Sequence, residues 1–305
     1  MTDAHSTERL LDPSVLAAIG RLDLIARTIV EGFLIGLHRS PFHGLSQEFA
    51  EHRPYMAGDE LRRIDWRVYA RTDRLYIKEF EEETNAPVRL LLDASNSMRY
   101  APREHDLSKL DYARYLAASL AYLANKQNDR TGLVCFGGEQ SARLETRGGE
   151  KHLHSIFATL EKQRAGGQVN IGEMLLREAA LWKRRGLVVL ISDLYDEPEA
   201  IASAVARVRR AGHDTIVFHL LDRAEKLLEH DGLREFRDLE TNETMTIDAA
   251  RVREDYRKRI NEVCAFYRRE FERAGVDYAQ LDTALSLDRA LAVYLRGRRV
   301  SRKLR

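Results

Sequence analysis

The stretch from Val88 to Met98, which reads Val-Arg-Leu-Leu-Leu-Asp-Ala-Ser-Asn-Ser-Met, constrains the fold more than any other part of the chain. Four of its first five residues are apolar, and Pro87 marks its beginning. A short apolar run bounded in this way is typical of a buried β-strand. A turn near Pro102 and a helical pattern from Leu107 follow. A buried strand followed by a helix opens a parallel α/β sheet, in which ligands bind beyond the carboxyl ends of the strands.

From this strand onward, strand-like and helix-like segments alternate along the chain. The patterns predict strands at about 88–93, 131–136, 142–145, 186–193, 214–221 and 276–281. They predict helices at about 107–126, 150–163, 171–184, 197–211, 249–274 and 286–297. The alternation indicates an α/β fold with a Rossmann-like, doubly wound and mostly parallel sheet. The short strand at 142–145 follows a Gly-Gly turn, so we expect it to be one antiparallel edge strand.

The predicted organisation has an N-terminal part at 1–87, an α/β domain at 88–300 with a small insertion at about 225–248, and a basic tail at 301–305. Asp12-Pro13 begins an amphipathic helix that extends to about Leu37, whose charged residues exclude a membrane span. The block at 45–87 is rich in charged and aromatic residues. Its pattern predicts a hairpin with strands at about 46–53 and 74–82, and a short helix capped by Asp59.

Composition restricts the classes of function. The chain has 305 residues, of which 44% are hydrophobic and 32% charged, and its net charge is +1. This balance gives no general reason to expect nucleic acid or an anionic membrane as a partner. Cys135 and Cys264 lie in apolar surroundings, so we expect buried free thiols and a cytoplasmic protein. No apolar signal segment stands at the N-terminus, which is consistent with that expectation.

Two of the predicted strands, at 88–93 and 186–193, end in an aspartate. Adjacent strand ends in a doubly wound sheet can bring Asp93 and Asp193 into one crevice, together with the hydroxyls of Ser95 and Ser97. Ligands that are all oxygen atoms suit a hard cation, and magnesium fits this set best. These four residues are therefore the candidate metal ligands.

The pattern Asp93-x-Ser95-x-Ser97, with a later strand ending in Ile-Ser-Asp193, resembles the metal-ion-dependent adhesion site (MIDAS) of von Willebrand factor A domains. The preceding block reads Arg53-Pro-Tyr-x-x-Gly-Asp59-x-x-Arg62-x-Ile64-Asp-Trp66-x-x-x-Ala70-Arg71 and continues as Leu75-x-x-Lys78-x-Phe80-Glu-x-Glu83. It is similar to the signature of the bacterial domain-of-unknown-function 58 family, over about residues 35–300. The resemblance implies an A-type domain that binds a protein partner, with candidate partner-binding residues at Arg53, Asp59, Arg62, Asp65, Trp66 and Arg71.

One position departs from the adhesion-site pattern. A-type domains supply a further hydroxyl from a Thr in a Gly-Gly-Thr-Asn-like loop, whereas this chain reads Gly166-Gly-Gln-Val-Asn170. Val169 or Gln168 stands where the Thr is expected, and Asn170 or a water is the candidate substitute ligand. Magnesium is therefore conditional, with a weak magnesium site and a metal-free remnant both left open.

The resemblance favours a non-enzymatic interaction module that acts as partner or adaptor of a MoxR-type AAA+ ATPase in protein assembly or activation. We expect no small-molecule substrate and no membrane contact. The alternative is a magnesium-dependent hydrolase or phosphotransfer enzyme using Asp93 and Asp193, but no nucleophile elbow, phosphate loop or zinc helix accompanies them. The stretch 296–305 has six basic residues and no acidic one, which raises nucleic acid as a third and less favoured partner.

Overall fold

The computed structural model of the chain describes residues 20–39, 52–54, 66–78, 87–103, 106–138, 141–228, 232–239 and 243–303. Within these, the residues of 20–36 and 87–303 form one compact unit, and those of 37–78 form a second. The first unit includes most of helix α3 (Leu22–Arg39), which the sequence analysis groups with the accessory block. The buried side chains of Ile25 and Ile29 explain this placement, because they give α3 an apolar face.

A six-stranded sheet with the order β10-β7-β6-β3-β4-β5 forms the centre of the first unit. Its strands are β3 (Val88–Ala94), β4 (Thr131–Gly137), β5 (Ala142–Arg147), β6 (Leu187–Ser192), β7 (Asp214–Leu221) and β10 (Asp277–Asp282). All neighbouring strands pair in parallel except β4 and β5, which are antiparallel. The prediction of a mostly parallel sheet with one antiparallel edge strand is therefore confirmed. Every residue of β3 and β6 is buried, as expected for central strands of a parallel sheet.

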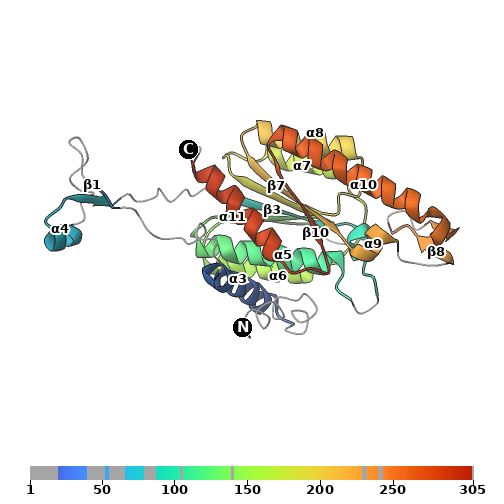
Figure 1. Ribbon diagram of the computed structural model, residues 1–305, viewed down its shortest axis with the longest axis horizontal. Helices are drawn as coiled ribbons and strands as arrows, with labels where there is room; N and C mark the ends of the chain where they lie inside the picture. Colours follow the sequence, from blue (N-terminus) through green and yellow to red (C-terminus); the bar gives the residue numbers. More distant parts are fainter. Residues whose placement is uncertain are drawn as a thin grey trace. The chain divides into compact units, whose positions relative to one another are not determined.

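Helices cover both faces of this sheet (Figure 1). One face carries α5 (Lys109–Lys126), α6 (Glu150–Lys162) and α11 (Asp288–Lys303), with α3 lying outside α5 and α6. The other carries α7 (Ile171–Ala180), α8 (Pro198–Arg210) and α10 (Ala249–Ala274). Strand β3 leads through α5 to β4 on one side, whereas β6, β7 and β10 are added on the other side of β3. The winding direction therefore reverses between β3 and β6, which makes this the switch point of the sheet.

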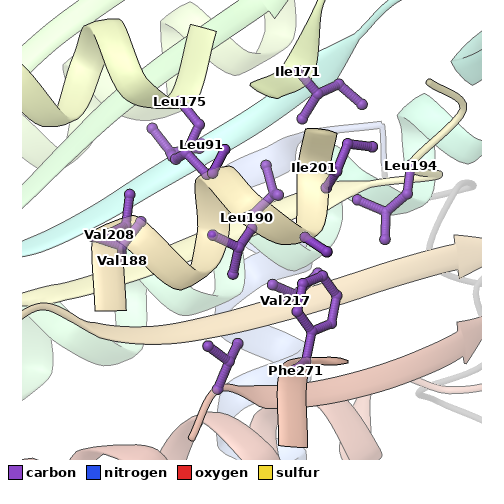
Figure 2. Close-up of a cluster of buried hydrophobic side chains, with 14 of the residues drawn as sticks. Leu91, Ile171, Leu175, Val188, Leu190, Leu194, Ile201, Val208, Val217 and Phe271 are labelled. Carbon is purple, nitrogen blue, oxygen red and sulfur yellow. The ribbon is translucent and has the colours of Figure 1, made fainter. Parts of the chain in front are cut away.

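A buried hydrophobic cluster fills the layer between the sheet and the helices α7, α8 and α10. Figure 2 shows that the sheet and these helices both contribute side chains to it, among them Leu91, Val188, Leu190, Val217, Ile171, Leu175, Ile201, Val208 and Phe271. The apolar positions of α8 recur at three- and four-residue steps, so one face of the helix meets the sheet. Leu194, just beyond β6, belongs to the same cluster and anchors the loop at the strand end.

The segment after β7 contains helix α9 (Arg223–Leu227) and an antiparallel hairpin of β8 (Leu233–Arg237) and β9 (Thr244–Asp248). The predicted small insertion at about 225–248 is thus a hairpin preceded by a short helix. Two predicted boundaries are wrong. Helix α7 ends at Ala180 rather than at 184, and the Trp182 ring just beyond it packs against Arg89 and His213. Helix α11 continues to Lys303, through most of the predicted tail at 301–305, in keeping with the helix propensity of Arg and Lys.

Besides the last residues of α3, the described part of the second unit contains β1 (His52–Pro54), α4 (Trp66–Thr72) and β2 (Tyr76–Lys78). The two strands are antiparallel, as the predicted hairpin requires, but each is described only over three residues. The rings of Trp66 and Tyr69 meet edge to face with centroids 6.0 Å apart, and both side chains are exposed. The predicted helix cap Asp59 lies outside the described residues.

Two further expectations concern the thiols and the membrane. Cys135 and Cys264 are buried and form no disulfide, as predicted. Burial raises the pKa of the Cys135 thiol to about 12, so it stays protonated at neutral pH. None of the described helices combines the length and the apolar character that crossing a bilayer requires.

Candidate functional site

The candidate site lies at the carboxyl ends of β3 and β6, where the winding of the sheet reverses. These strands are neighbours, with Leu92 opposite Ile191. Asp93 is the next residue of β3, and Asp193 follows two residues after Ile191, directly beyond β6. The structure therefore brings the two predicted aspartates to adjacent strand ends at the position where open α/β sheets bind ligands.

Asp93 is completely buried and both of its carboxyl oxygens accept hydrogen bonds. The Ser95 backbone N–H donates to Oδ1 at 2.9 Å, and the Ser192 hydroxyl donates to Oδ2 at 2.5 Å. Burial, with the negative charge of Asp193, raises the pKa of Asp93 to about 7. This carboxyl group is thus held by the protein on both sides and gains a proton close to neutral pH.

Ser95 and Ser97 lie in the loop and short 3₁₀ helix η2 (Asn96–Arg99) that follow β3. Both side chains are buried, and their hydroxyl oxygens are 3.1 Å apart, within hydrogen-bond distance. The backbone of Gly137, at the end of β4, approaches this loop so closely that a Cβ atom there would lie 2.7 Å from Ser95 N. The adjoining strand therefore fixes the position of the serine loop from one side.

Asp193 is paired with a lysine that the sequence reasoning did not include in the site. Lys109 Nζ donates to Asp193 Oδ2 at 2.7 Å and to both carboxylate oxygens of Glu225 at 3.0 and 3.1 Å. The side chains of Lys109 and Asp193 are each only 2% exposed. Burial opposes the charge of Lys109, but the carboxylates of Asp193 and Glu225 outweigh it and raise the lysine pKa above its ordinary value.

The loop at the expected Thr position contributes no hydroxyl. Val169 packs against the hydrophobic cluster, and Gln168 is exposed. Asn170 is the N-cap of α7, and its Oδ1 accepts a hydrogen bond from the Glu173 N–H at 2.8 Å. The side-chain oxygen of the suggested substitute ligand is therefore used at the helix terminus.

The candidate ligands, as they are arranged here, do not suit magnesium. Magnesium requires near-octahedral oxygen ligation and binds mainly through carboxylates. Of the predicted ligands, Asp193 already binds an ammonium group, and both oxygens of Asp93 accept hydrogen bonds. In the part of the chain that the structure describes, no cluster of three or more His, Cys, Asp or Glu side chains is arranged to hold a metal ion.

An exposed rim surrounds the buried crevice. We define this rim by Arg99, Gln168 and Tyr195, which stand on three loops at the carboxyl edge of the sheet and are all exposed. Backbone hydrogen bonds from Asn96 N to Gly167 O and from Gly166 N to Ala94 O connect two of the loops. Tyr195 is 61% exposed, which makes it a large aromatic side chain open to solvent on the rim.

Asp196 and the Leu194 backbone hold the third loop of the rim in place. The Asp196 carboxylate accepts a hydrogen bond from Ile171 N at 2.9 Å, which ties this loop to the start of α7. Leu194 has a φ of 54°, a left-handed conformation unusual for a branched side chain. Its N–H donates to Ser192 Oγ, and its carbonyl accepts from the Tyr267 hydroxyl. Hydrogen bonds therefore connect this loop to α7, β6 and α10.

The predicted partner-binding residues of the accessory block fall in the second unit. Arg53 lies in β1, and Trp66 and Arg71 lie in α4, where both side chains are exposed. Asp59, Arg62 and Asp65 lie outside the described residues. The structure thus gives no common geometry for these six residues, and their role stays a prediction.

Sequence reasoning missed Lys109, Glu225 and Ser192. A signal existed for Lys109, because it precedes Tyr112 and Leu116 at three- and seven-residue steps on the buried face of α5. Ser192 was visible next to Asp193 but has no role in the adhesion-site pattern. Glu225 carried no signal, since it enters the site only through the placement of α9 after β7.

The sheet order, the reversal between β3 and β6 and the Asp-x-Ser-x-Ser loop at that reversal define a von Willebrand factor A-like α/β protein. The chain belongs to the family described as "Protein of unknown function DUF58", which it matches over residues 51–264. Uncharacterized proteins of Mycobacterium bovis and Mycobacterium tuberculosis are 29% identical to it over 216 residues. That match covers 69% of this chain and 66% of theirs, slightly under two thirds of the relatives' length.

Several solved structures are similar at low identity. The conserved hypothetical protein BatB from Bacteroides thetaiotaomicron is 16% identical with a TM-score of 0.46, over 71% of this chain and 97% of that one. An aerotolerance-related membrane protein from Bacteroides fragilis is 18% identical with a TM-score of 0.46, and the match covers 69% of this chain and 98% of that one. The VWA domain of SpRpn10 is 10% identical with a TM-score of 0.35, and the match covers 46% of this chain and 77% of that one.

Proposed function

We propose that this chain is a non-enzymatic protein-interaction module that binds its partner at the rim above a degenerate adhesion-type site. The observation that supports this most is the contrast between the crevice and its edge. Asp93, Ser95, Ser97 and Asp193 are all buried, whereas Tyr195 is exposed on a loop that they help to fix. Exposed tyrosines are typical anchors of protein interfaces.

The family resemblance suggests a partner, namely a MoxR-type AAA+ ATPase that the module assists in assembling or activating other proteins. This partner implies a cytoplasmic location, which we propose with it. The exposed aromatic pair of Trp66 and Tyr69 in the second unit offers a second region of contact, in the block that carries the family signature. Contact by two separate units would increase the overall affinity without requiring strong binding at either.

We do not propose catalysis by Asp93 and Asp193. A nucleophilic or basic carboxylate needs an oxygen that reaches the substrate. The oxygens of Asp93 accept hydrogen bonds from Ser95 and Ser192, and Asp193 is paired with Lys109. Phosphatase and phosphodiesterase turnover that disappears in Asp93→Asn would contradict this part of the proposal.

The test of the binding function uses the full chain and a purified MoxR-type ATPase, with affinity measured by biolayer interferometry. Tyr195→Ala should weaken binding about tenfold or more, the usual effect of truncating an interface anchor. Leu181→Ala is the matched control, because Leu181 is 50% exposed but precedes β6 at the opposite edge of the sheet. Equal affinity of both variants would exclude the rim, and no binding by the unmodified chain would exclude this ATPase class.

A further inference from the structure

A positively charged side chain already lies among the carboxylates of the crevice. The ammonium group of Lys109 is 2.7 Å from Asp193 Oδ2 and 3.0 Å from Glu225 Oε1, so it bridges an acidic residue of the loop after β6 and one of helix α9. The Lys109 side chain is 2% exposed, which shows that the whole side chain is enclosed. An enclosed ammonium group in contact with carboxylate oxygens supplies the same sign of charge to the same atoms as a bound cation.

The position of Lys109 in its helix is not one that helix stability favours. Ser108 is the N-cap of α5 and forms a capping box with Asp111, so Lys109 is the first residue of the helix. A positive charge at this end is unfavourable, because it lies at the positive end of the helix dipole. The carboxylates of Asp193 and Glu225 offset this cost. A residue that breaks a local preference in this way is expected at a site with a specific role.

The oxygens that a metal ion would use are bound to groups of the protein. Asp93 accepts hydrogen bonds from Ser95 and Ser192, the Ser95 and Ser97 hydroxyls are within hydrogen-bond distance of each other, and Asp193 accepts from Lys109. The loop at the expected Thr position supplies no hydroxyl, because Val169 packs against the hydrophobic cluster. The contact that puts a positive charge where a metal ion would lie is the one between Lys109 and Asp193.

We propose that the Lys109 ammonium group is a tethered cation that replaces the divalent metal ion of adhesion-type sites in this chain. The crevice then keeps its charge balance and its loop geometry without metal. The inference concerns the cation alone and does not depend on which partner binds the rim. Its test therefore uses metal ions without any partner protein, so that its failure is separate from failure of the proposed function.

The test measures binding of Mn²⁺, as a paramagnetic substitute for Mg²⁺, to the full chain by electron paramagnetic resonance. The unmodified chain should bind no Mn²⁺ that competes with millimolar Mg²⁺. Lys109→Ala removes the ammonium and leaves Asp193 and Glu225 without it, so this variant should gain one Mn²⁺ site. Lys109→Arg keeps the charge and should gain none. Lys126→Ala is the matched control, since Lys126 is 42% exposed at the other end of the same helix.

The possible results separate cleanly. Stoichiometric Mn²⁺ binding by the unmodified chain that Asp193→Asn abolishes overturns the proposal, and so does a folded Lys109→Ala variant that gains no site. If Lys109→Ala is unstable, it is prepared in millimolar Mg²⁺ together with Lys109→Gln, and thermal unfolding is followed on adding a chelator. A fall in Tm in these variants but not in the unmodified chain supports the proposal. If the chelator leaves the Tm of the unmodified chain and of both variants unchanged, the proposal is overturned.

Discussion

The Ser192 hydroxyl donates a hydrogen bond of 2.5 Å to Asp93 Oδ2, which joins the ends of the two central strands at the switch point. The Ser192 Oγ atom in turn accepts a hydrogen bond from the Leu194 N–H at 2.9 Å. One serine thus connects the buried carboxyl group of β3 to the loop that carries Tyr195. Hydrogen bonds to a buried charged or polar group are costly to remove when one partner stays behind.

Ser192→Ala should therefore lower the free energy of unfolding by about 1–3 kcal/mol, because it leaves a buried carboxyl oxygen and a backbone N–H without this partner. Urea unfolding followed by circular dichroism measures the change. Ser155→Ala is the control, since Ser155 is exposed in α6 and bonds only to a carbonyl of its own helix. A loss no larger than that of Ser155→Ala would show that the Ser192–Asp93 contact is energetically unimportant.

Much of the fold follows from local sequence. The apolar runs of β3 and β6 are long enough for strands, too short for helices and buried on both faces, which indicates the centre of a parallel sheet. The alternation of strands and helices then predicts the doubly wound topology, and with it the approach of Asp93 to Asp193. The N-cap role of Asn170 was also predictable, because Asn is a favoured cap and α7 begins directly after it.

The chemistry of the crevice could not be predicted in the same way. A lysine at the start of a helix is normally solvated, and only the capping box and the placement of α9 bring Lys109 and Glu225 together. These contacts join residues 116 positions apart, so no local pattern reports them. The candidate ligands were found because they follow strands, whereas the group that pairs with Asp193 depends on tertiary packing.

Replacing Lys109 by Met should lower the free energy of unfolding by about 3–5 kcal/mol, the usual cost of leaving a buried carboxylate without its partner. The measurement is made in chelator, so that no metal compensates for the lost charge. Lys126→Met is the control, because the Lys126–Glu31 pair is exposed and such pairs contribute about 0–1 kcal/mol. Adding Asp193→Asn to Lys109→Met should cost less than the sum of the single changes. An additive result would mean that the two side chains are not energetically coupled.

Gly137→Ala should displace the serine loop. Gly137 has a φ of 65°, and a Cβ atom would lie 2.7 Å from Ser95 N and 3.0 Å from Ser95 Cα. Backbone strain alone is worth about 1–3 kcal/mol, and the overlap with fixed backbone atoms adds to it. Gly232→Ala is a matched control, with a φ of 72° and no atom within 4 Å of the added Cβ. Equal losses of stability in both variants, measured by thermal unfolding, would remove the argument that close approach fixes Ser95.

The buried His219 should make stability depend on pH. Burial lowers its pKa to about 4, whereas the unfolded chain has the ordinary value near 6.5. The unfolded state therefore takes up a proton first as the pH falls, and stability is lost between about pH 6.5 and 4, by up to about 3 kcal/mol. His219→Gln should be less stable at pH 7, since it loses the contact between Nδ1 and the Tyr278 hydroxyl at 2.7 Å. Its stability should nevertheless fall less between pH 7 and 5 than that of the unmodified chain.

Urea unfolding at several pH values between 7 and 5 measures this slope for the unmodified chain and the variant. His154→Gln provides the comparison, because His154 is exposed in α6 and its removal should leave the slope unchanged. Carboxyl groups also titrate in this range, among them Asp93 with its pKa of about 7, but they are common to all three proteins and cancel in the difference. If His219→Gln and His154→Gln have the same slope, another group carries the pH dependence, and the pKa of His219 does not differ between the folded and unfolded states.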